Sequence, residues 1–356
     1  DQVRLLRSAR NVGRALKSGV TTVCDCGSWN QTAFSLKEGL ALGLVEGSRL
    51  LASGRPITST GGHLWFMGGE ADGVDGVRQR VRELLKEGAD FIKVCATGGA
   101  MTEGSNRTRA QYSSEELLAL VEDAHRLRKT VAAHTLSTDG MRNVVEAGCD
   151  TIEHCHWYGP EEREYPLDDG VARELAAKGL FVSPVIGAGD QAGYLATQCS
   201  EPVRDLSVRG ESSGTDFYDS IRQEYGGFIN TDQSQLHFAN LKRMKELGAN
   251  FIVGSDAGAG MTRFQDLWLC IAVFVSSLDF TVVEAVRSAT QLAAQALGID
   301  DELGSIEPGK LADIVVVAGD PLTDGLWRMR EVDMVIKDGV VVVDGGVSQT
   351  ALSPIM

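Results

Sequence analysis

Short apolar runs that follow helical stretches recur along the chain. They are clearest in KSGVTTVCDCG, KEGADFIKVCATGG, EAGCDTIEHC, AKGLFVSPV and ELGANFIVGSD. In each segment a glycine stands where a left-handed residue closes a helix, and a run of apolar or β-branched residues follows it. Such runs are typical of strands that are buried on both faces. Their alternation with helices predicts parallel βαβ units and an α/β fold.

Seven strands are predicted from these runs and from two weaker ones. They span residues 20–25, 45–52, 91–96, 131–134, 151–154, 181–184 and 251–255. The length of the chain allows two domains, or one large barrel with an appendage. Residues 1–19 have the pattern of an amphipathic helix, so the chain begins on a helix with no strand before it.

The pattern changes after residue 299. Residues 303–308 (LGSIEP) are rich in turn formers, and ADIVVVAGD and DMVIKDGVVVVDGG then predict strands joined by a hairpin turn at Asp338-Gly339. A lone hairpin is marginally stable, so this tail is expected to pack against another part of the protein. We therefore predict two units, residues 1–302 and residues 303–356.

Composition narrows the classes of partner. The 34 Lys and Arg residues are outnumbered by 49 Asp and Glu, and the net charge of -15 disfavours binding to nucleic acid or to an anionic membrane. The longest apolar stretch, residues 267–278, is too short to span a bilayer. It is expected to pack in the barrel, although part of it facing another subunit would give a homo-oligomer. The 7 cysteines form no CxxC pair, which favours reduced thiols and a cytoplasmic protein.

Residues able to bind metals stand at the ends of four predicted strands. Lys93 ends FIK, His134 ends VAAH, His154 ends TIEH and Asp256 ends VGSD. The carboxyl ends of parallel barrel strands share one face, which is where barrel enzymes keep their active sites. A charged lysine inside an apolar strand is costly because burial disfavours its charge. Lys93 is therefore either an ammonium that reaches the barrel mouth or pairs with a carboxylate, or a neutral amine that CO2 converts to a cation-bridging carbamate.

The other members of this set also have structural interpretations. A single histidine at a strand end is more often a structural residue than a ligand. Two histidines at the ends of consecutive strands occur by chance less often, which favours a role as ligands. Asp256 has an alternative role as the N-cap of the next helix. Taken together, the four side chains form a nitrogen and oxygen donor set that suits Zn²⁺ or another divalent ion.

The segments around these residues resemble the amidohydrolase superfamily. TTVCDCG is similar to the pattern of the family's second barrel strand, and FIKVCATGGAM and TIEHC are closer still. SATQLAAQALGIDDELGSIEPGKLADIVVV resembles the final barrel helix and its return into a small β-sandwich. The resemblance covers nearly the whole chain. It is nearest to the branch of imidazolonepropionase-like enzymes, Xaa-Pro dipeptidases and related carboxypeptidases.

The resemblance implies a (β/α)8 TIM-like barrel joined to part of a small β-sandwich domain, residues 303–356. It also implies a pair of divalent ions, two Zn²⁺ or other divalent ions, bridged by Lys93 after CO2 has carboxylated its amine. His134 and His154 would hold one ion. Asp256 would bind at the other and move a proton from the attacking water to the leaving nitrogen.

One feature departs from the family pattern. The family's first barrel strand ends in a His-x-His pair that binds the more buried metal, and the only such spelling here is His154-Cys155-His156, at the sixth-strand position. His156 is therefore interpreted as a loop residue or a substrate contact. The first strand and its metal ligands are expected upstream of Asp1, so that the sequence is a fragment of a longer chain. The alternative is a protein that has lost half of a binuclear site.

The function implied is metal-dependent hydrolysis of a carbon–nitrogen amide bond in a small molecule, a dipeptide or an N-acyl amino acid. An alternative substrate for the same site is a cyclic amide, a carbamate or thiocarbamate, or a xenobiotic ester. A second alternative is a non-catalytic barrel without its metal pair. Substrate contacts are predicted on loops after the strands, although each residue also has a structural or surface interpretation. The candidates are His63, Arg109 as a carboxylate clamp, Tyr194 and His156.

Overall fold

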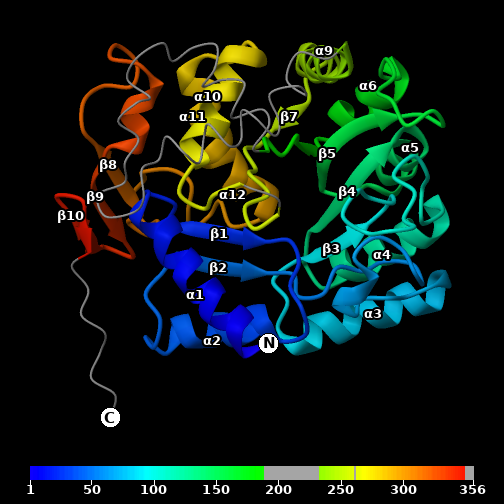
Figure 1. Cartoon of the computed structure of the whole chain (residues 1–356), viewed down its shortest axis with the longest axis horizontal. Helices are drawn as coiled ribbons and strands as arrows, with labels where there is room; N and C mark the ends of the chain where they lie inside the picture. The colour runs from blue at the N-terminus through cyan, green and yellow to red at the C-terminus, as the bar shows by residue number, and fades with distance from the viewer. Residues whose placement is uncertain (188–231, 260–261, 349–356) are drawn as a thin grey trace.

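The computed structural model describes residues 1–187, 232–259 and 262–348 (Figure 1). Its main sheet is parallel and five-stranded, in the order β3-β4-β5-β6-β7. Two further parallel strands, β1 and β2, continue this wall, because Ile57 after β2 forms a bridge with Val94 of β3. The strands are β1 (Thr22–Asp25), β2 (Arg49–Ala52), β3 (Ile92–Cys95), β4 (Val131–Ser137), β5 (Thr151–Tyr158), β6 (Phe181–Ser183) and β7 (Asn250–Phe251).

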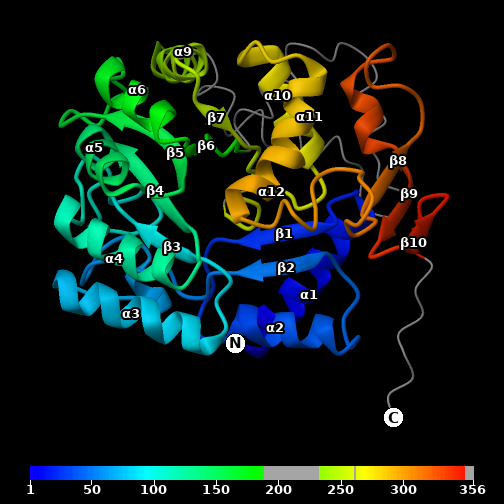
Figure 2. The same ribbon diagram turned by 180° about the vertical axis from the view of Figure 1, so that it is seen from behind.

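Helices cover the outer side of the curved wall of strands, as Figures 1 and 2 show. Capping boxes at Ser113–Glu116 and Thr281–Glu284 start two of them, because each pair satisfies backbone N–H groups that the first helical turn leaves unpaired. The helices are α1 (Gln2–Lys17), α2 (Thr32–Ala41), α3 (Gly73–Glu87), α4 (Ser114–Arg126), α5 (Thr138–Ala147), α6 (Asp169–Ala177), α9 (Asp232–Glu246), α10 (Leu267–Ser277), α11 (Val282–Ala289) and α12 (Gln291–Leu297), with a short 3-10 helix η1 (Trp65–Met67).

The glycine signal in the sequence is confirmed where helices meet strands. Gly88 closes α3 at φ +106° and Gly148 closes α5 at φ +76°, a region that costs a residue with a side chain. The chain turns there and enters β3 and β5. At both positions the glycine followed by an apolar run therefore marks where the helix ends and the next strand begins.

The core lies between the strands and the surrounding helices. One continuous cluster of buried apolar residues joins β3–β7 to α3, α4, α5 and α10, and its largest members include Trp157, Phe251 and Phe274. The apolar stretch predicted to pack in the barrel forms α10, in which seven consecutive residues from Trp268 to Phe274 are buried. Among the described residues, no helix combines the length and apolar character needed to cross a membrane.

The predicted tail forms a separate antiparallel sheet in the order β11-β10-β9-β8. Asp338 and Gly339, both with positive φ, form the predicted turn between β9 and β10. Leu16 of α1 packs against Val335 and its neighbours in this sheet, so the tail has the packing partner that the sequence required. The elements are β8 (Ile314–Val317), the 3-10 helix η3 (Leu326–Arg330), β9 (Val332–Lys337), β10 (Val340–Asp344) and β11 (Val347–Ser348).

The seven predicted strands all occur, with different lengths. β4 and β5 continue three and four residues beyond the predicted ends at His134 and His154, and β7 is only two residues long. The extension arises because Thr135 and Ser137 keep pairing with β5 across a register shift that reaches Tyr158. His134 and His154 therefore lie within strands, and His156, interpreted from sequence as a loop residue, also belongs to β5.

Candidate active site

Lys93 lies inside the barrel wall. It is the second residue of β3, its side chain is 5% exposed, and its Nζ forms an ion pair with the Glu153 carboxylate of β5. The Cys26 thiol donates to Glu153 Oε1 at 3.0 Å. A hydrogen bond with Cys24 and burial raise the pKa of Cys26, so this thiol keeps the proton that it donates. Burial of the charged lysine is thus balanced by a carboxylate partner, which is the pairing that one interpretation of the sequence anticipated.

Three histidine rings gather next to this ion pair. The ring of His134 lies 4.5 Å from that of His63 and 4.6 Å from that of His154, measured between ring centroids. Burial lowers the pKa of His134, helped by the neighbouring His154 ring, and burial followed by the Lys93 charge lowers the pKa of His154. Burial and Lys93 also lower the pKa of His63 to about 4. The rings are therefore neutral near pH 7, which is the state in which imidazole binds a metal.

Hydrogen bonds fix which ring nitrogens are available. His134 Nε2 donates to the carbonyl oxygen of Gly98 at 3.2 Å, so the lone pair of this ring is on Nδ1. His63 Nδ1 lies 3.0 Å from the Thr102 hydroxyl, which also accepts from the backbone N–H of Leu64. The polar loop after β3 thereby orients two of the three rings.

The backbone of β5 is unusual where it carries these groups. His154 and Cys155 have φ values of +65° and +58°, a left-handed conformation that residues with side chains rarely adopt. The register between β4 and β5 shifts at the same place. Strain of this kind persists where the surrounding structure fixes it, and here it sets the direction of the His154 ring.

Two carboxylates lie near the ends of strands, Asp25 as the last residue of β1 and Asp256 after β7. Asp256 comes after β7 in a turn, at φ +50°, and α10 begins only at Leu267, so Asp256 does not cap that helix. It keeps contact with solvent, but desolvation by the surrounding protein raises its pKa. Burial also raises the pKa of Asp25 to about 6. The hydrogen bond that the Gly27 N–H donates to its carboxylate at 2.8 Å acts in the opposite direction. Desolvation therefore raises the pKa of both carboxylates above that of a fully solvated aspartate, although Asp256 remains exposed to solvent.

The charge of Lys93 connects the predicted metal-binding residues. It shifts the pKa of His134, His154 and Asp256, and that of the predicted substrate contact His63. The centroid distances place the rings of His63, His134 and His154 next to one another, and Lys93 forms its ion pair with Glu153 beside them. We call Lys93, Glu153, His63, His134 and His154 the lysine cluster.

The remaining predicted contacts lie elsewhere. Arg109 is exposed on the loop after β3. Its neighbour Arg107 pairs with Glu162 at 3.4 Å and lies 5.1 Å from the centre of the Tyr158 ring. Tyr194 lies outside the described residues. The lysine cluster therefore includes His63, whereas Arg109 lies at the surface.

His156 belongs to a second group, which we call the glutamate cluster: His156, Glu164 and His237. The two imidazole rings are stacked with centroids 3.9 Å apart, and Nδ1 of each faces a different oxygen of Glu164, at 3.0 Å for His156 and 3.5 Å for His237. Burial opposes ionisation of Glu164, but its bonds to the two histidines lower its pKa to about 2. The carboxylate is therefore charged although its side chain is only 1% exposed.

Sequence reasoning missed Glu153 and Glu164. Glu153 had a usable signal, because a charged residue inside the apolar run TIEH needs a buried partner, and Lys93 in the apolar run FIKVCA offers a cation. Glu164 had none, since it stands in the charged segment EEREY, which resembles a solvated surface loop. Only the fold of this loop back onto β5 and α9 buries it.

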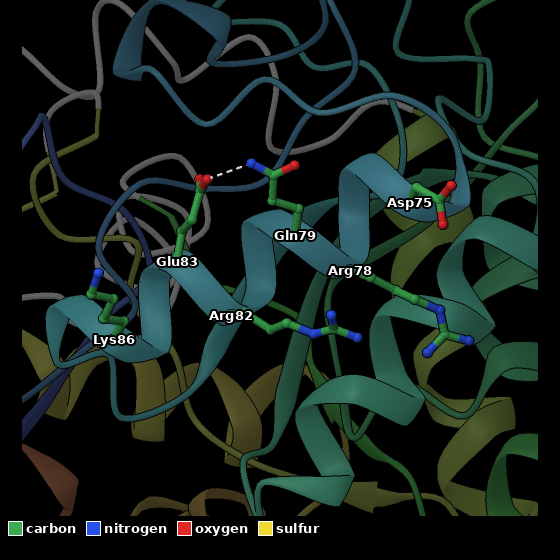
Figure 3. Close-up of a pocket in the computed structure, with 6 residues that line it drawn as sticks. All are labelled: Asp75, Arg78, Gln79, Arg82, Glu83 and Lys86. Atoms are coloured by element: carbon green, nitrogen blue, oxygen red, sulfur yellow. Dashed lines mark hydrogen bonds between the residues drawn. The ribbon is translucent and has the colours of Figure 1, made fainter.

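A hollow of about 430 Å³ lies far from this chemistry, on the outer surface of α3 (Figure 3). Charged and amide side chains of that single helix line it, among them Arg78 and Arg82. Both arginines form ion pairs with the buried carboxylate of Asp123 on α4, which joins the two helices. These groups are occupied in helix packing, so the hollow is no alternative active site.

The sequence matches the model of the amidohydrolase family over residues 6–342. The chain belongs to the amidohydrolase family. The parallel strands with outer helices and the small antiparallel sheet agree with this assignment, and the resemblance inferred from the motifs is confirmed.

Characterised relatives differ in their substrates. An ochratoxinase from Aspergillus niger is 25% identical over 345 residues, which cover 89% of this chain and 64% of the relative. An imidazolonepropionase from Symbiobacterium thermophilum is 35% identical over 115 residues, 31% of this chain and 26% of that protein. The crystal structure of a Xaa-Pro dipeptidase with bound methionine in its active site superposes with a TM-score of 0.76 at 27% identity, and the match covers 96% of this chain and 79% of that one. The chain thus spans about two thirds of the length of the ochratoxinase.

Proposed function

We propose that this protein is a metal-dependent hydrolase that cleaves the C–N amide bond of a dipeptide or an N-acyl amino acid. The observation that carries the proposal is the grouping of neutral His134 and His154 with buried Lys93, whose charge also acts on the pKa of Asp256. This combination provides nitrogen donors, a bridging position and a group that can accept and return a proton.

The donor set suits divalent cations. His134 and His154 would hold one ion, and Asp256 would bind at a second, zinc being our choice for both. Divalent ions bound there supply Lewis acidity, which activates water and polarises the amide carbonyl. Their presence in the protein is part of the proposal.

Lys93 takes the bridging position after carboxylation. Its neutral Nζ attacks the carbon of CO2, a N–C bond forms, and one proton leaves the nitrogen to give a carbamate anion. This step requires the ion pair with Glu153 to separate, because an anion beside that carboxylate is repelled. Protonation of Glu153, or movement of its side chain toward the Cys26 thiol, relieves the repulsion.

Asp256 carries the proton between the two halves of the reaction. Its carboxylate accepts a proton from the attacking water and then donates it to the leaving amide nitrogen. Desolvation raises its pKa and brings it closer to the working pH, which favours both transfers. His63, neutral and oriented through Thr102, is placed to hydrogen-bond the substrate carbonyl.

Two findings favour a substrate of the dipeptide or N-acyl amino acid class. The Xaa-Pro dipeptidase matches over almost the whole chain, and its bound methionine carries an amino acid carboxylate. Arg109 is exposed on the loop after β3, and we propose that it clamps such a carboxylate, with Tyr194 and His156 as further contacts. The likeness to imidazolonepropionase supports a cyclic amide as the alternative substrate.

Several wider features belong to the same proposal. Residues 1–302 would form the barrel unit and residues 303–356 part of a β-sandwich unit. The net charge of -15 and the cysteine pattern favour a cytoplasmic enzyme that acts on small molecules rather than nucleic acid or membranes.

A hydrolysis panel tests the proposal. The full-length protein, stripped with a chelator and reloaded with zinc and bicarbonate, is assayed on Xaa-Pro dipeptides, N-acyl amino acids, cyclic amides and carbamates. We expect about two zinc ions per chain and turnover of the first two classes. His125→Ala is the matched histidine control, because this ring lies at the surface and pairs with Asp150. A folded protein that takes up no metal and hydrolyses nothing would overturn the enzyme assignment.

A further inference from the structure

We propose that the glutamate cluster, His156, Glu164 and His237, is a binding site for a divalent transition-metal cation, distinct from the proposed catalytic pair of ions. Of its three members only His156 is also a proposed substrate contact. The three side chains come from β5, from the loop that follows it and from α9. Their ligand atoms all lie within 4.8 Å of one another. No ligand role for Glu164 or His237 is needed by the proposed hydrolytic reaction.

The arrangement has the composition of a known cation site. Two histidines and one carboxylate bind zinc and iron in proteins and leave positions open for other ligands. Ligand atoms around one tetrahedral zinc lie about 3–3.5 Å apart, from bond lengths of about 2 Å. The two Nδ1–carboxylate distances of 3.0 and 3.5 Å already match that spacing, so only the two rings need a small adjustment.

The ring orientation favours a shared ion. The imidazoles of His156 and His237 are stacked with an angle of 23° between their planes, and both turn Nδ1 toward Glu164. Without an ion, each Nδ1 carries a hydrogen that it donates to the carboxylate. An ion replaces both hydrogens, and each ring then carries its N–H on Nε2.

Neighbouring groups fix the position of Glu164 by hydrogen bonds, as the residues around a metal ligand usually do. Its Oε1 accepts from the backbone N–H of Trp157 at 3.1 Å and from Asn240 Nδ2 at 3.0 Å. Its backbone N–H bonds the side chain of Gln233. Such outer contacts fix the direction of a ligand before the ion binds, which reduces the cost of organising the site.

The charge balance also calls for a cation. Glu164 is a buried anion whose side chain is 1% exposed, and the side chains of its two ring partners are 25% and 12% exposed. Among the described residues, its ion-pair partners are these two histidines. A divalent ion bound between the three side chains would supply positive charge next to this buried carboxylate.

Cobalt titration provides a test that does not depend on hydrolysis. Stripped full-length protein is dialysed against Co²⁺ alone, and the bound equivalents and the visible absorption of the ion are measured for the wild type and four variants. Glu164→Gln and His237→Ala remove ligands of the glutamate cluster, and Glu164→Gln keeps an oxygen that accepts from Trp157. Lys93→Ala removes the proposed catalytic bridge, and His125→Ala is the surface control. Thermal melting of each variant confirms that it is folded.

The outcomes separate this site from the proposed function. We expect Glu164→Gln and His237→Ala each to lose one equivalent of Co²⁺ relative to the wild type, with a matching loss of absorption. Lys93→Ala should retain that equivalent whether or not the enzyme hydrolyses anything. Equal binding by the wild type and both cluster variants would show that the three residues form only a hydrogen-bonded network and would overturn the proposal. Loss of all Co²⁺ in Lys93→Ala would also overturn it, because the site would not be separate.

Discussion

Two histidine clusters share strand β5, and the buried charges that they surround have opposite signs. The lysine cluster surrounds an amine, with Glu153 as its counterion and three histidine rings beside it. The glutamate cluster surrounds a carboxylate, with two stacked histidines as hydrogen-bond donors. His154 belongs to the first and His156 to the second. The same residue type therefore serves as a neutral neighbour of a cation in one place and as a donor to an anion in the other.

The backbone between the two clusters explains how one strand serves both. Residues two apart on a regular strand point to the same side. The left-handed conformations of His154 and Cys155 break that alternation, and the ring of His154 turns toward His134 while His156 stacks on His237. The strain thus separates two sites that a regular strand would place on one face.

The largest expected effect comes from removing the amine. Lys93→Ala should lower kcat/KM by about a thousandfold or more, on the scale of losing a major transition-state stabilising group. Hydrolysis rates of the reloaded enzyme measure it, and thermal melting should show a folded protein. Activity close to that of the wild type would remove Lys93 from the bridging position.

Removing the carboxylate should act on stability instead. Glu164→Ala should lower the free energy of unfolding by about 2–4 kcal/mol, because buried donors on Trp157, Asn240 and His156 lose their acceptor. Denaturant unfolding in the presence of a chelator measures this without bound ions. Glu161→Ala, at an exposed position of the same loop, is the control and should change stability by less than about 0.5 kcal/mol. Equal effects at the two positions would contradict the structural importance of the glutamate cluster.

Two arginines on the loop after β3 sharpen the contrast. Arg109→Ala should raise KM about tenfold for substrates with a free carboxylate and leave neutral amides unchanged, as expected for a lost bidentate clamp. Arg107→Ala is the matched variant, because Arg107 already pairs with Glu162 beside the aromatic ring of Tyr158. It should leave KM for both substrate classes unchanged. Equal KM changes for charged and neutral substrates in Arg109→Ala would exclude the clamp.

The smallest effect concerns the counterion of the amine. Glu153→Gln removes the anion that favours the ammonium form of Lys93, so carboxylation should need about three- to tenfold less bicarbonate, which corresponds to about 0.7–1.4 kcal/mol. Reactivation of stripped enzyme at a series of bicarbonate concentrations measures the shift. A higher bicarbonate requirement would mean that Glu153 stabilises the carboxylated lysine rather than opposing it.

Much of the fold could be predicted from the sequence because its signals are local. A glycine that ends a helix and an apolar run that follows it depend on neighbouring residues alone, so all seven strands of the wall were located. Strand lengths were less predictable, because the continuation of β5 to Tyr158 depends on pairing with β4 across a register shift. The grouping of Lys93, His134 and His154 followed from the rule that parallel strands share an end.

The rest of the site depends on contacts between distant segments. Glu164 and His237 are 73 residues apart in sequence, and the pattern of each on its own is that of a solvated loop or an ordinary helix. His156 was interpreted as a loop residue or a substrate contact, and the structure places it in β5; nothing in the spelling HCH indicates the positive φ values of His154 and Cys155. Backbone strain and long-range burial are properties of the folded chain, so the glutamate cluster became visible only in three dimensions.

The attachment of the small sheet has a practical consequence. Arg49, at the starting end of β2, forms ion pairs with Asp313 at 2.8 Å and with Asp338 of the β9–β10 turn. Figure 1 shows the sheet beside the starting ends of β1 and β2, whereas the histidines of both clusters belong to other elements, mainly β4 and β5. Leu322, 63% exposed on the loop after β8, is therefore a suitable anchor point for immobilising the protein on a solid support. A molecule held there is attached through the small sheet and leaves the strands that carry the histidines untouched.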